Sequence, residues 1–234
     1  MTVGVTRAGI GTLRERPLHA ALKQRYARPG DAVEVAVDGF VIDLVRDDLL
    51  IEIQTRGFSS ARRKFASLLE RGHRLLVVHP IAVDTWITKV GDDGELLSRR
   101  RSPRHGAPCD VFAELVNVAP LLGHPGLELE LVLVEMEELR RHAPDGPWRR
   151  RGWTVVERRL LDIVDHRTFL GVPDLVELLP ADLDDPFTTA DLATRLGRPR
   201  RLAQQMAYCL RTAGALEPAD ARTRNVRYRL SRPA

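Results

Sequence analysis

Two carboxylates lie inside one of the most apolar stretches of the chain, and they are its strongest candidates for chemistry. The runs Phe40 to Val45 and Leu49 to Gln54 are rich in Val, Ile and Leu. Polar residues 46 to 48 separate them, so the pattern predicts a β-hairpin. The first arm contains Asp43 and the second contains Glu52. Arms this apolar are expected to be buried on both faces, where an unpaired carboxylate is unfavourable.

The register of the hairpin brings the two carboxylates together. A two-residue turn at positions 47 and 48 places Asp43 directly opposite Glu52. Like charges at opposed positions, with Cβ atoms about 4.5 to 5.5 Å apart, destabilise a sheet unless a cation lies between them. Gln54 projects from the same face as Glu52. Carboxylate and amide oxygens are hard ligands that suit Mg²⁺ or Mn²⁺, so the hairpin predicts a metal site.

A second interpretation of the hairpin needs no metal. Asp43 and Glu52 would then be strand-end residues that reach solvent, with an arginine such as Arg46 or Arg56 pairing one of them. A three-residue turn would also shift the pairing by one position and weaken the metal hypothesis. Two opposed acids with a polar third residue favour the metal site.

The motif resembles that of a known nuclease fold. A helix bearing Glu15, then Asp-x(8)-Glu-x-Gln on a hairpin, then a basic helix is similar to the core of the PD-(D/E)XK nuclease superfamily, over roughly residues 13 to 90. The resemblance is closest to variants with Glu-x-Gln in place of Glu-x-Lys, as in competence-protein-like nucleases and some restriction enzymes. The whole chain also resembles an uncharacterised bacterial family in which a winged helix follows this core.

This resemblance implies roles for five residues. Asp43 and Glu52 would be metal ligands, and Ile53 would offer its backbone carbonyl to the same ion. Gln54 would occupy the position of the usual lysine. Glu15 would match the catalytic glutamate often found on the first helix.

The glutamine is a departure that bears on activity. The usual lysine orients the attacking water and stabilises charge that develops at phosphorus, whereas a neutral amide positions water without bringing charge. Lys64 or an arginine of the following helix is the expected substitute. Without one, the core would be a catalytically inactive nuclease fold.

The segments around the hairpin predict an α/β (α+β) fold with a mixed sheet flanked by helices. Apolar residues at helical spacing predict a first helix from Leu13 to Tyr26. Pro17 belongs in a first turn, which places Glu15 at or just before the helix start. An acid there is as consistent with capping as with catalysis. His19 is interpreted as a surface or packing residue.

A basic helix is predicted after the hairpin, from about Ala61 to Arg71, with Ser59 or Ser60 as its cap. Three cations lie in its first turn, where they oppose the helix dipole unless an anion is nearby. A DNA phosphate is the favoured anion, and the hairpin acids are the alternative. These cations are Arg62, Arg63 and Lys64.

Further strands are predicted at Val33 to Val37, Leu75 to His79, 84 to 90 and 127 to 136, with a helix from Asp110 to Leu122. His79 is interpreted as structural. Four arginines between 99 and 104 are predicted to lie in a loop, which either follows phosphates or is merely solvated.

The segment from 142 to 153 is predicted to be a linker or a surface turn. Its tryptophans, Trp148 and Trp153, flank three arginines and are interpreted as covering a domain joint rather than stacking on bases. The pattern from Thr154 to Phe169 is read as helical.

The C-terminal region, Phe187 to Leu230, resembles a winged helix-turn-helix domain. Thr188 and Asp191 form a capping signature, and Leu202, Met206, Cys209 and Leu210 are the expected core. Arginine and glutamine are the residue types that contact guanine and adenine edges. DNA binding is favoured over a packing or protein-binding role. The residues expected to contact DNA are Arg200, Arg201, Gln204, Gln205, Arg211, Arg222, Arg224, Arg227 and Arg229.

Length and composition fit this organisation. The 234 residues, 44% of them hydrophobic, suffice for a nuclease-like domain (1–143), a linker with connecting helices (144–186) and the winged helix (187–234). Residues 140–234 hold 18 Lys and Arg against 12 Asp and Glu, whereas residues 1–139 hold 18 against 20. No apolar run is long enough to span a membrane, so a cytoplasmic protein with reduced cysteines is expected.

The halves together predict a Mg²⁺-dependent DNA endonuclease, with DNA as partner and a homodimer as a possible assembly. The first alternative is a catalytically inactive nuclease-like protein that binds DNA or regulates. The second is an interaction protein whose two domains both contact protein. A small-molecule enzyme is disfavoured, since the chain has no phosphate-cradling glycine loop, nucleophile elbow or zinc spacing.

Overall fold

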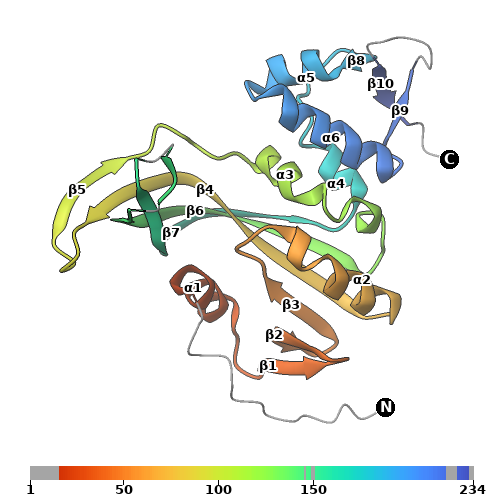
Figure 1. Ribbon diagram of the computed structural model, residues 1–234. Coiled ribbons are helices and arrows are strands. Elements are labelled where there is room, and N and C mark those ends of the chain that lie inside the picture. The colour runs from red at the N-terminus through yellow and green to blue at the C-terminus, as the bar shows by residue number, and fades with distance from the viewer. Residues whose placement is uncertain (1–15, 145, 149–150, 220–225, 232–234) are drawn as a thin grey trace. The chain divides into compact units, whose positions relative to one another are not determined.

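The computed structural model describes residues 16–144, 146–148, 151–219 and 226–231 (Figure 1). The chain forms two compact units. The first comprises Met1–Thr55, Val78–Ala107 and Glu130–Arg167, and the second comprises Arg56–Val77, Pro108–Leu129 and Thr168–Ala234. The architecture is α+β, with a mixed sheet flanked by helices, as predicted.

The main sheet has seven strands in the order β1-β2-β3-β4-β6-β7, with β5 paired to β4. Strands β4 and β6 are long and contribute residues to both units. The strands are β1 (Ala32–Val37), β2 (Phe40–Arg46), β3 (Leu49–Ile53), β4 (Arg74–Val90), β5 (Leu96–Arg101), β6 (Leu127–His142) and β7 (Trp153–Phe169).

Strands β1, β2 and β3 form an antiparallel meander with tight turns. The first turn is Asp38–Gly39, whose φ angles of 50° and 83° are the left-handed values that Asp-Gly pairs accept in two-residue hairpins. The second turn confirms the predicted register, because Arg46 pairs with Leu49 and Leu44 pairs with Ile51. The prediction of an isolated strand at 33–37 missed that this segment is the outer arm of a second hairpin.

Helix α1 (Pro17–Tyr26) begins at the proline, as the fixed φ of that residue predicts. Its N-cap is Arg16, and Glu15 lies outside the described residues. The helix buries Leu18 and Leu22 and packs beside β3.

Strand β4 is a single strand through Pro80, although two strands were predicted on either side of it. Proline removes a ladder donor, so it is tolerated in a strand only where no neighbour needs that donor. The Gln54 N–H donates to the Val78 carbonyl, and pairing of β4 with β5 starts at Trp86, so Pro80 lies outside the β4–β5 ladder.

The arginine-rich segment predicted as a loop is in part strand β5, antiparallel to β4. The tight turn at 91–95 lets residues 96–101 fold back along β4 as an added ribbon (Figure 1). All six residues of β5 are exposed.

The helix predicted from Thr154 is wrong: residues 153–169 form strand β7 at the edge of the main sheet. The apolar pairs of VVERRLLDIV fit both the helical and the strand periodicity. Pairing with β6 stabilises the strand. The connection is a hairpin turn closed by a bond from Ala143 N–H to the Gly152 carbonyl. Trp148 in this turn is 82% exposed, so the surface-turn interpretation holds and the covered joint does not.

Two aspartates on strand β7 accept hydrogen bonds from backbone amides of the same strand. Asp162 accepts a hydrogen bond from the Ile163 amide, and Asp165 accepts one from the His166 amide, each at 2.8 Å. The side chains of Val156, Leu161 and Val164 are exposed along the same strand.

The second unit contains the basic helix α2 (Arg62–Glu70), close to its predicted bounds. Its apolar stripe is buried, and Phe65 meets Phe58 edge to face with ring centroids 6.1 Å apart. The predicted serine cap is wrong, because Ser59 and Ser60 lie in a 3-10 turn (Phe58–Ser60) and Ala61 is the N-cap. Glu114 accepts a hydrogen bond from the Phe58 amide, which fixes the entry to that turn.

The helix predicted from 110 to 122 is broken into short turns. A 3-10 turn (Pro108–Val111), α3 (Phe112–Leu115) and a second 3-10 turn (Ala119–Leu121) replace it. Pro120 and the β-branched valines lower helix propensity here. A short helix, α4 (Val172–Val176), follows β7.

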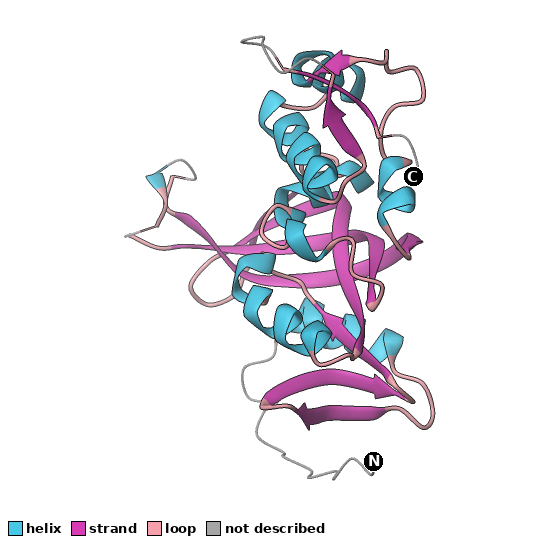
Figure 2. Cartoon of the chain, turned by 90° about the vertical axis from the view of Figure 1, so that its right-hand side faces the viewer, coloured by secondary structure: helices cyan, strands magenta, loops and turns pink. Residues whose placement is uncertain are grey.

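The C-terminal elements form a helix pair with a small sheet (Figure 2). They are β8 (Phe187–Thr188), α5 (Thr189–Leu196), α6 (Arg200–Thr212), β9 (Leu216–Pro218) and β10 (Arg227–Leu230), with sheet order β8-β10-β9. The predicted capping box is confirmed, since the Thr188 hydroxyl accepts from the Asp191 amide and the Asp191 carboxylate accepts from the Thr188 amide.

The predicted core of helix α6 is confirmed. Leu202, Met206, Cys209 and Leu210 are all buried. Burial raises the pKa of the Cys209 thiol to about 12, so this cysteine is an apolar packing residue at neutral pH.

Candidate metal centre and nucleic-acid surfaces

The two hairpin carboxylates are held in largely buried positions in the first unit. The Asp43 side chain is 15% exposed and Glu52 is 9% exposed. Asp43 Oδ2 accepts a hydrogen bond of 2.8 Å from the Ile53 backbone amide, across the hairpin. A side chain thus bonds the β3 backbone just beyond the last regular pair, Leu44 with Ile51. The predicted opposition of Asp43 and Glu52 follows from that register.

A third acid, Glu34, lies in line with this pair and was missed by sequence reasoning. In the β1–β2 ladder Val33 pairs with Leu44 and Val35 pairs with Ile42, so Glu34 falls opposite Asp43. Its φ of 53° interrupts the strand geometry there. The first hairpin was not predicted, so this neighbour of Asp43 was not sought.

Helix α1 faces these acids with one polar stripe. The imidazole of His19 lies with Nε2 3.2 Å from Asp43 Oδ2, and Lys23 Nζ lies 2.8 Å from Glu34 Oε1. The Tyr26 hydroxyl donates to Glu130 at 2.6 Å. Residues 19, 23 and 26 share a helix face, and that spacing was the available signal for His19. His19 therefore belongs to the site and is more than the packing residue that was expected.

The partners in two of these contacts determine where the proton lies. A carboxylate only accepts, so His19 carries its proton on Nε2 in the contact with Asp43. Burial of the Tyr26 phenol, together with its bond to Glu130, raises the pKa of Tyr26 far above its ordinary value. Tyr26 thus remains a neutral donor.

His79 closes the other end of the site. It is 8% exposed, and its Nδ1 lies 2.7 Å from the Gln54 carbonyl oxygen. A carbonyl oxygen only accepts, so Nδ1 is the protonated nitrogen in this contact. The backbone N–H of Gln54 in turn donates to the Val78 carbonyl. The backbone around the motif glutamine is thereby held on both sides, and His79 is a member of the site that sequence reasoning set aside.

Arg46 does not neutralise the hairpin acids through its observed contacts. Its guanidinium donates twice to Asp31, at 3.0 and 2.8 Å, and once to the Tyr26 carbonyl at 2.8 Å. The Arg46 hydrogen bonds hold the pKa of Asp31 below its usual range. The interpretation in which Arg46 pairs Asp43 or Glu52 is therefore not supported.

The donor set fits a hard divalent cation with an incomplete protein coordination sphere. Asp43 and Glu52 offer carboxylate oxygens, and Ile53 follows directly with a backbone carbonyl. Within the described residues, no three His, Cys, Asp or Glu side chains are arranged to hold a metal ion. Mg²⁺ commonly keeps several waters and takes one or two carboxylates together with substrate phosphate oxygens, so two carboxylates suffice.

The basic residues expected to contact nucleic acid lie in the second unit. On α2, Arg62 and Arg63 are exposed and Lys64 is half-buried, with no acid in the first turn. On α6, Arg200, Arg201, Gln204 and Arg211 are exposed and Gln205 is half-buried.

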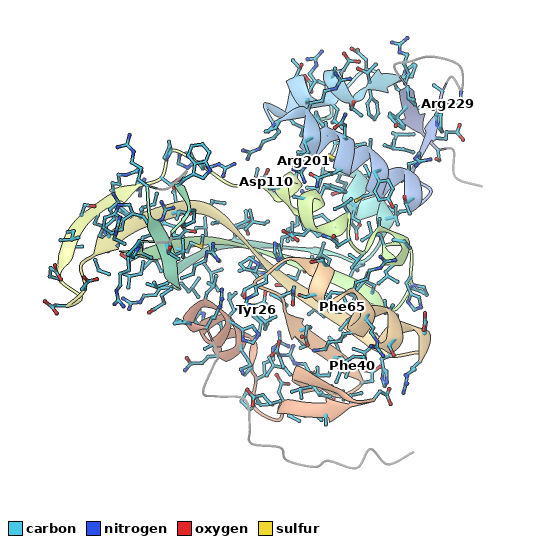
Figure 3. The ribbon with its side chains drawn as sticks, in the orientation of Figure 1. Tyr26, Phe40, Phe65, Asp110, Arg201 and Arg229 are labelled. Carbon is cyan, nitrogen blue, oxygen red and sulfur yellow. The ribbon has the colours of Figure 1, made fainter. Side chains whose placement is uncertain are left out.

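Tyr208 is an addition to the exposed face of α6. It is 41% exposed and lies one turn from Gln204 and Arg211 on the helix. The stripe that these residues form starts at Arg201, which is labelled in Figure 3. Aromatic residues at helical spacing usually indicate core, so sequence reasoning did not single out Tyr208.

The wing is only partly described. Arg227 is exposed on β10, whereas Arg229 is paired with Glu217 at 2.7 Å. Arg222 and Arg224 lie outside the described residues. None of the helices in the described part of the chain combines the length and apolar character needed to cross a membrane.

Comparison with known proteins identifies relatives without a described activity. A family described as Domain of unknown function (DUF8091) matches residues 16–170, which include every described residue of the hairpin site. The chain is 30% identical over 226 residues to a protein of Treponema pallidum (strain Nichols) described as "Uncharacterized protein", with 96% of this chain and 88% of that protein covered. No solved structure matches this chain.

Proposed function

We propose that this chain, which belongs to the family described as Domain of unknown function (DUF8091), is a Mg²⁺-dependent DNA endonuclease. The observation that carries the proposal is the pair Asp43 and Glu52 on the adjacent strands β2 and β3, one residue beyond the last ladder pair and in a largely buried setting. The order of a helix, an acidic hairpin and a basic helix supports a PD-(D/E)XK core. The pattern of α5, α6 and the β8-β10-β9 sheet supports a winged helix-turn-helix module.

Asp43, Glu52 and the Ile53 carbonyl would hold Mg²⁺, or Mn²⁺ in its place. When bound, the ion polarises the scissile phosphate and lowers the pKa of a coordinated water. The Ile53 amide and His19 Nε2 both bond Asp43 Oδ2, so they fix the direction of that carboxylate. This is the role that groups behind metal ligands commonly play.

The Gln54 side chain would orient the attacking water. His79 holds the Gln54 carbonyl and so keeps the motif backbone in one conformation. Glu15, by the resemblance, would take the proton of that water or bind a second ion.

DNA contacts are assigned to the C-terminal module and to α2. The exposed face of α6 offers two arginines, a glutamine and a tyrosine in one stripe. Phosphate contacts would set affinity, and α6 would add base preference through Arg201 and Gln204.

The test is nicking of supercoiled plasmid in Mg²⁺ or Mn²⁺ by the wild type, Asp43→Asn and Glu52→Gln. Both variants keep side-chain size and remove only a charged ligand. Each is expected to lower the nicking rate about 100-fold or more, because a metal ligand is lost. Asp47→Asn, in the turn of the same hairpin, is the matched control and should nick as the wild type does. Equal nicking by all four proteins would refute the metal site.

A catalytically inactive DNA-binding or regulatory protein is the second candidate, favoured by Gln54 in place of the usual lysine. It predicts duplex binding that is independent of divalent ions and no nicking by the wild type. A gel shift in EDTA beside the plasmid assay separates the two candidates.

A further inference from the structure

One basic and aromatic cluster in the first unit is not used by the proposed site. Antiparallel pairing places Arg101 opposite Trp86 and Arg99 opposite Thr88, so the two arginines and the indole share one face of the β4–β5 ribbon. The Arg99 guanidinium carbon lies 4.0 Å from the Trp86 ring centroid, and that of Arg101 lies 5.2 Å away. Trp86, Arg99 and Arg101 are called the Trp86 cluster below.

The Trp86 cluster is held in place from the neighbouring strand. Glu137 Oε1 accepts from the Thr88 hydroxyl at 2.6 Å and from Arg99 Nε at 3.1 Å. The Thr88 hydrogen bond, with help from Arg99, holds the pKa of Glu137 below its usual range. The Glu137 carboxylate and the Trp86 ring therefore fix the orientation of the Arg99 side chain.

Fold stability alone is a poor reason for this arrangement. An exposed cation–π contact and an exposed ion pair each contribute little to stability. Ordering an arginine side chain loses rotamer entropy that offsets much of this gain, and two arginines are ordered. The backbone ladder already fixes β5 on β4. These side-chain contacts therefore add little to fold stability, but they hold the two guanidinium groups in fixed orientations.

The charge of the region defines the chemistry of that ligand. From Leu96 to Arg104 the chain carries four arginines and no acid, and every residue of β5 is exposed. A guanidinium stacked on a ring can still donate from its in-plane N–H groups to phosphate. In Arg99 the Nε is taken by Glu137, so the two terminal nitrogens would supply a two-point contact. Arg99 and Arg101 are two residues apart on one strand face, about 6.6 Å along the strand, so they fit repeated anions.

We propose that the Trp86 cluster is a contact surface for the DNA phosphate backbone, separate from the metal site and from α6. The inference rests on the proposed function for the identity of the partner. The turn before β5 carries Asp92, Asp93 and Glu95, which repel phosphate and confine the contact to the C-terminal half of β5.

The test uses the full chain and a duplex of about 30 base pairs in EDTA, with affinity measured over a range of salt. Arg99→Gln with Arg101→Gln should weaken binding about tenfold or more and reduce the salt slope by about 2, one for each lost phosphate contact. Arg100→Gln is the matched control. It removes the same charge from the same strand, but Arg100 pairs with Ile87 and projects from the opposite face, so its binding and slope should match the wild type.

A second readout follows Trp86 directly. The chain has three tryptophans, so Trp148→Phe with Trp153→Phe leaves Trp86 as the only indole. Its emission should change on adding duplex, and this signal should survive Asp43→Asn. If Arg99→Gln with Arg101→Gln melts earlier than the wild type, Arg101→Lys serves instead. That variant keeps the charge, loses the two-point contact and should weaken binding by a smaller factor.

The outcomes separate this inference from the proposed function. If the wild type binds duplex with an unchanged Trp86 signal and the arginine variants keep the wild-type salt slope, the proposed role of the Trp86 cluster is overturned. The endonuclease proposal would be unaffected. Absence of duplex binding by the wild type would overturn both. A Trp86 response to polyglutamate without one to duplex would replace DNA by an acidic protein as the occupant.

Discussion

Gln54 is the residue on which the choice between an active and an inactive core depends. It occupies the position where the resemblance expects lysine, and its backbone is fixed by His79 and Val78. A neutral amide there can orient water but cannot offset charge at phosphorus. These backbone bonds would remain with any side chain at position 54.

Replacing this residue tests the point. Gln54→Lys should raise Mg²⁺-dependent nicking about tenfold or more, or create nicking if the wild type shows none, because the ammonium adds charge at the reacting phosphate. Gln54→Met keeps the length, loses the polar group and should lower nicking. Plasmid nicking rates at equal metal concentration give the comparison. A lysine variant that folds, binds DNA and nicks more slowly than Gln54→Met would contradict this role.

At the scale of elements, Arg46 is the tether between the hairpin and the end of α1. Its guanidinium joins Asp31 to the Tyr26 carbonyl, and the Asp31 side chain is almost fully buried in that contact. The tether holds α1 so that His19 and Lys23 stay over the acids of β1 and β2.

The tether should appear in the pH dependence of stability. The pKa of Asp31 is lower in the folded protein than its ordinary 3.8, so its stabilisation is present above that value and is lost as pH falls through the folded pKa. Asp31→Asn should cost about 2 kcal/mol of unfolding free energy at pH 7. The gap to the wild type should shrink below pH 4. Urea unfolding at both pH values measures it, and Asp92→Asn, on an exposed turn, should show no such gap.

The sequence predicted the hairpin well and the elements beyond it poorly, for physical reasons that differ by element. The turn at 47–48 follows from local chemistry, and the α5 cap follows from the side chains of Thr188 and Asp191. Strand β7 depends on a partner strand, β6, which single-sequence periodicity does not see. β5 was missed because its arginines look like loop residues until they are paired with β4.

Only the part of the site that is local in sequence was predicted. Asp43, Glu52 and Gln54 are close in sequence and fall on one hairpin, so spacing alone joined them. His19, Glu34 and His79 reach the site from α1, β1 and β4. Their arrival depends on long-range packing, which the pattern of any one segment does not encode.

On the scale of the whole molecule, the main sheet ends in a seventeen-residue edge strand, β7. A long edge with exposed valine and leucine is a template on which another chain can add a strand. The carboxylates of Asp162 and Asp165 accept hydrogen bonds from the amides of Ile163 and His166. Successive amides of a strand point to opposite sides, and these two are three residues apart, so one of them faces the open edge and is taken before another chain can use it.

We expect these two aspartates to limit aggregation at this edge. Asp162→Ala with Asp165→Ala should leave the folded protein competent to bind DNA yet make it scatter light within hours at concentrations where the wild type stays clear. Asp92→Ala with Asp93→Ala removes the same charge from a turn and should stay clear. If both double variants scatter alike, net charge rather than the shielded edge keeps the protein in solution. The aspartates of β7 would then contribute nothing to solubility, whereas the expected result would show that side-chain hydrogen bonds on an edge strand keep other chains from pairing with it.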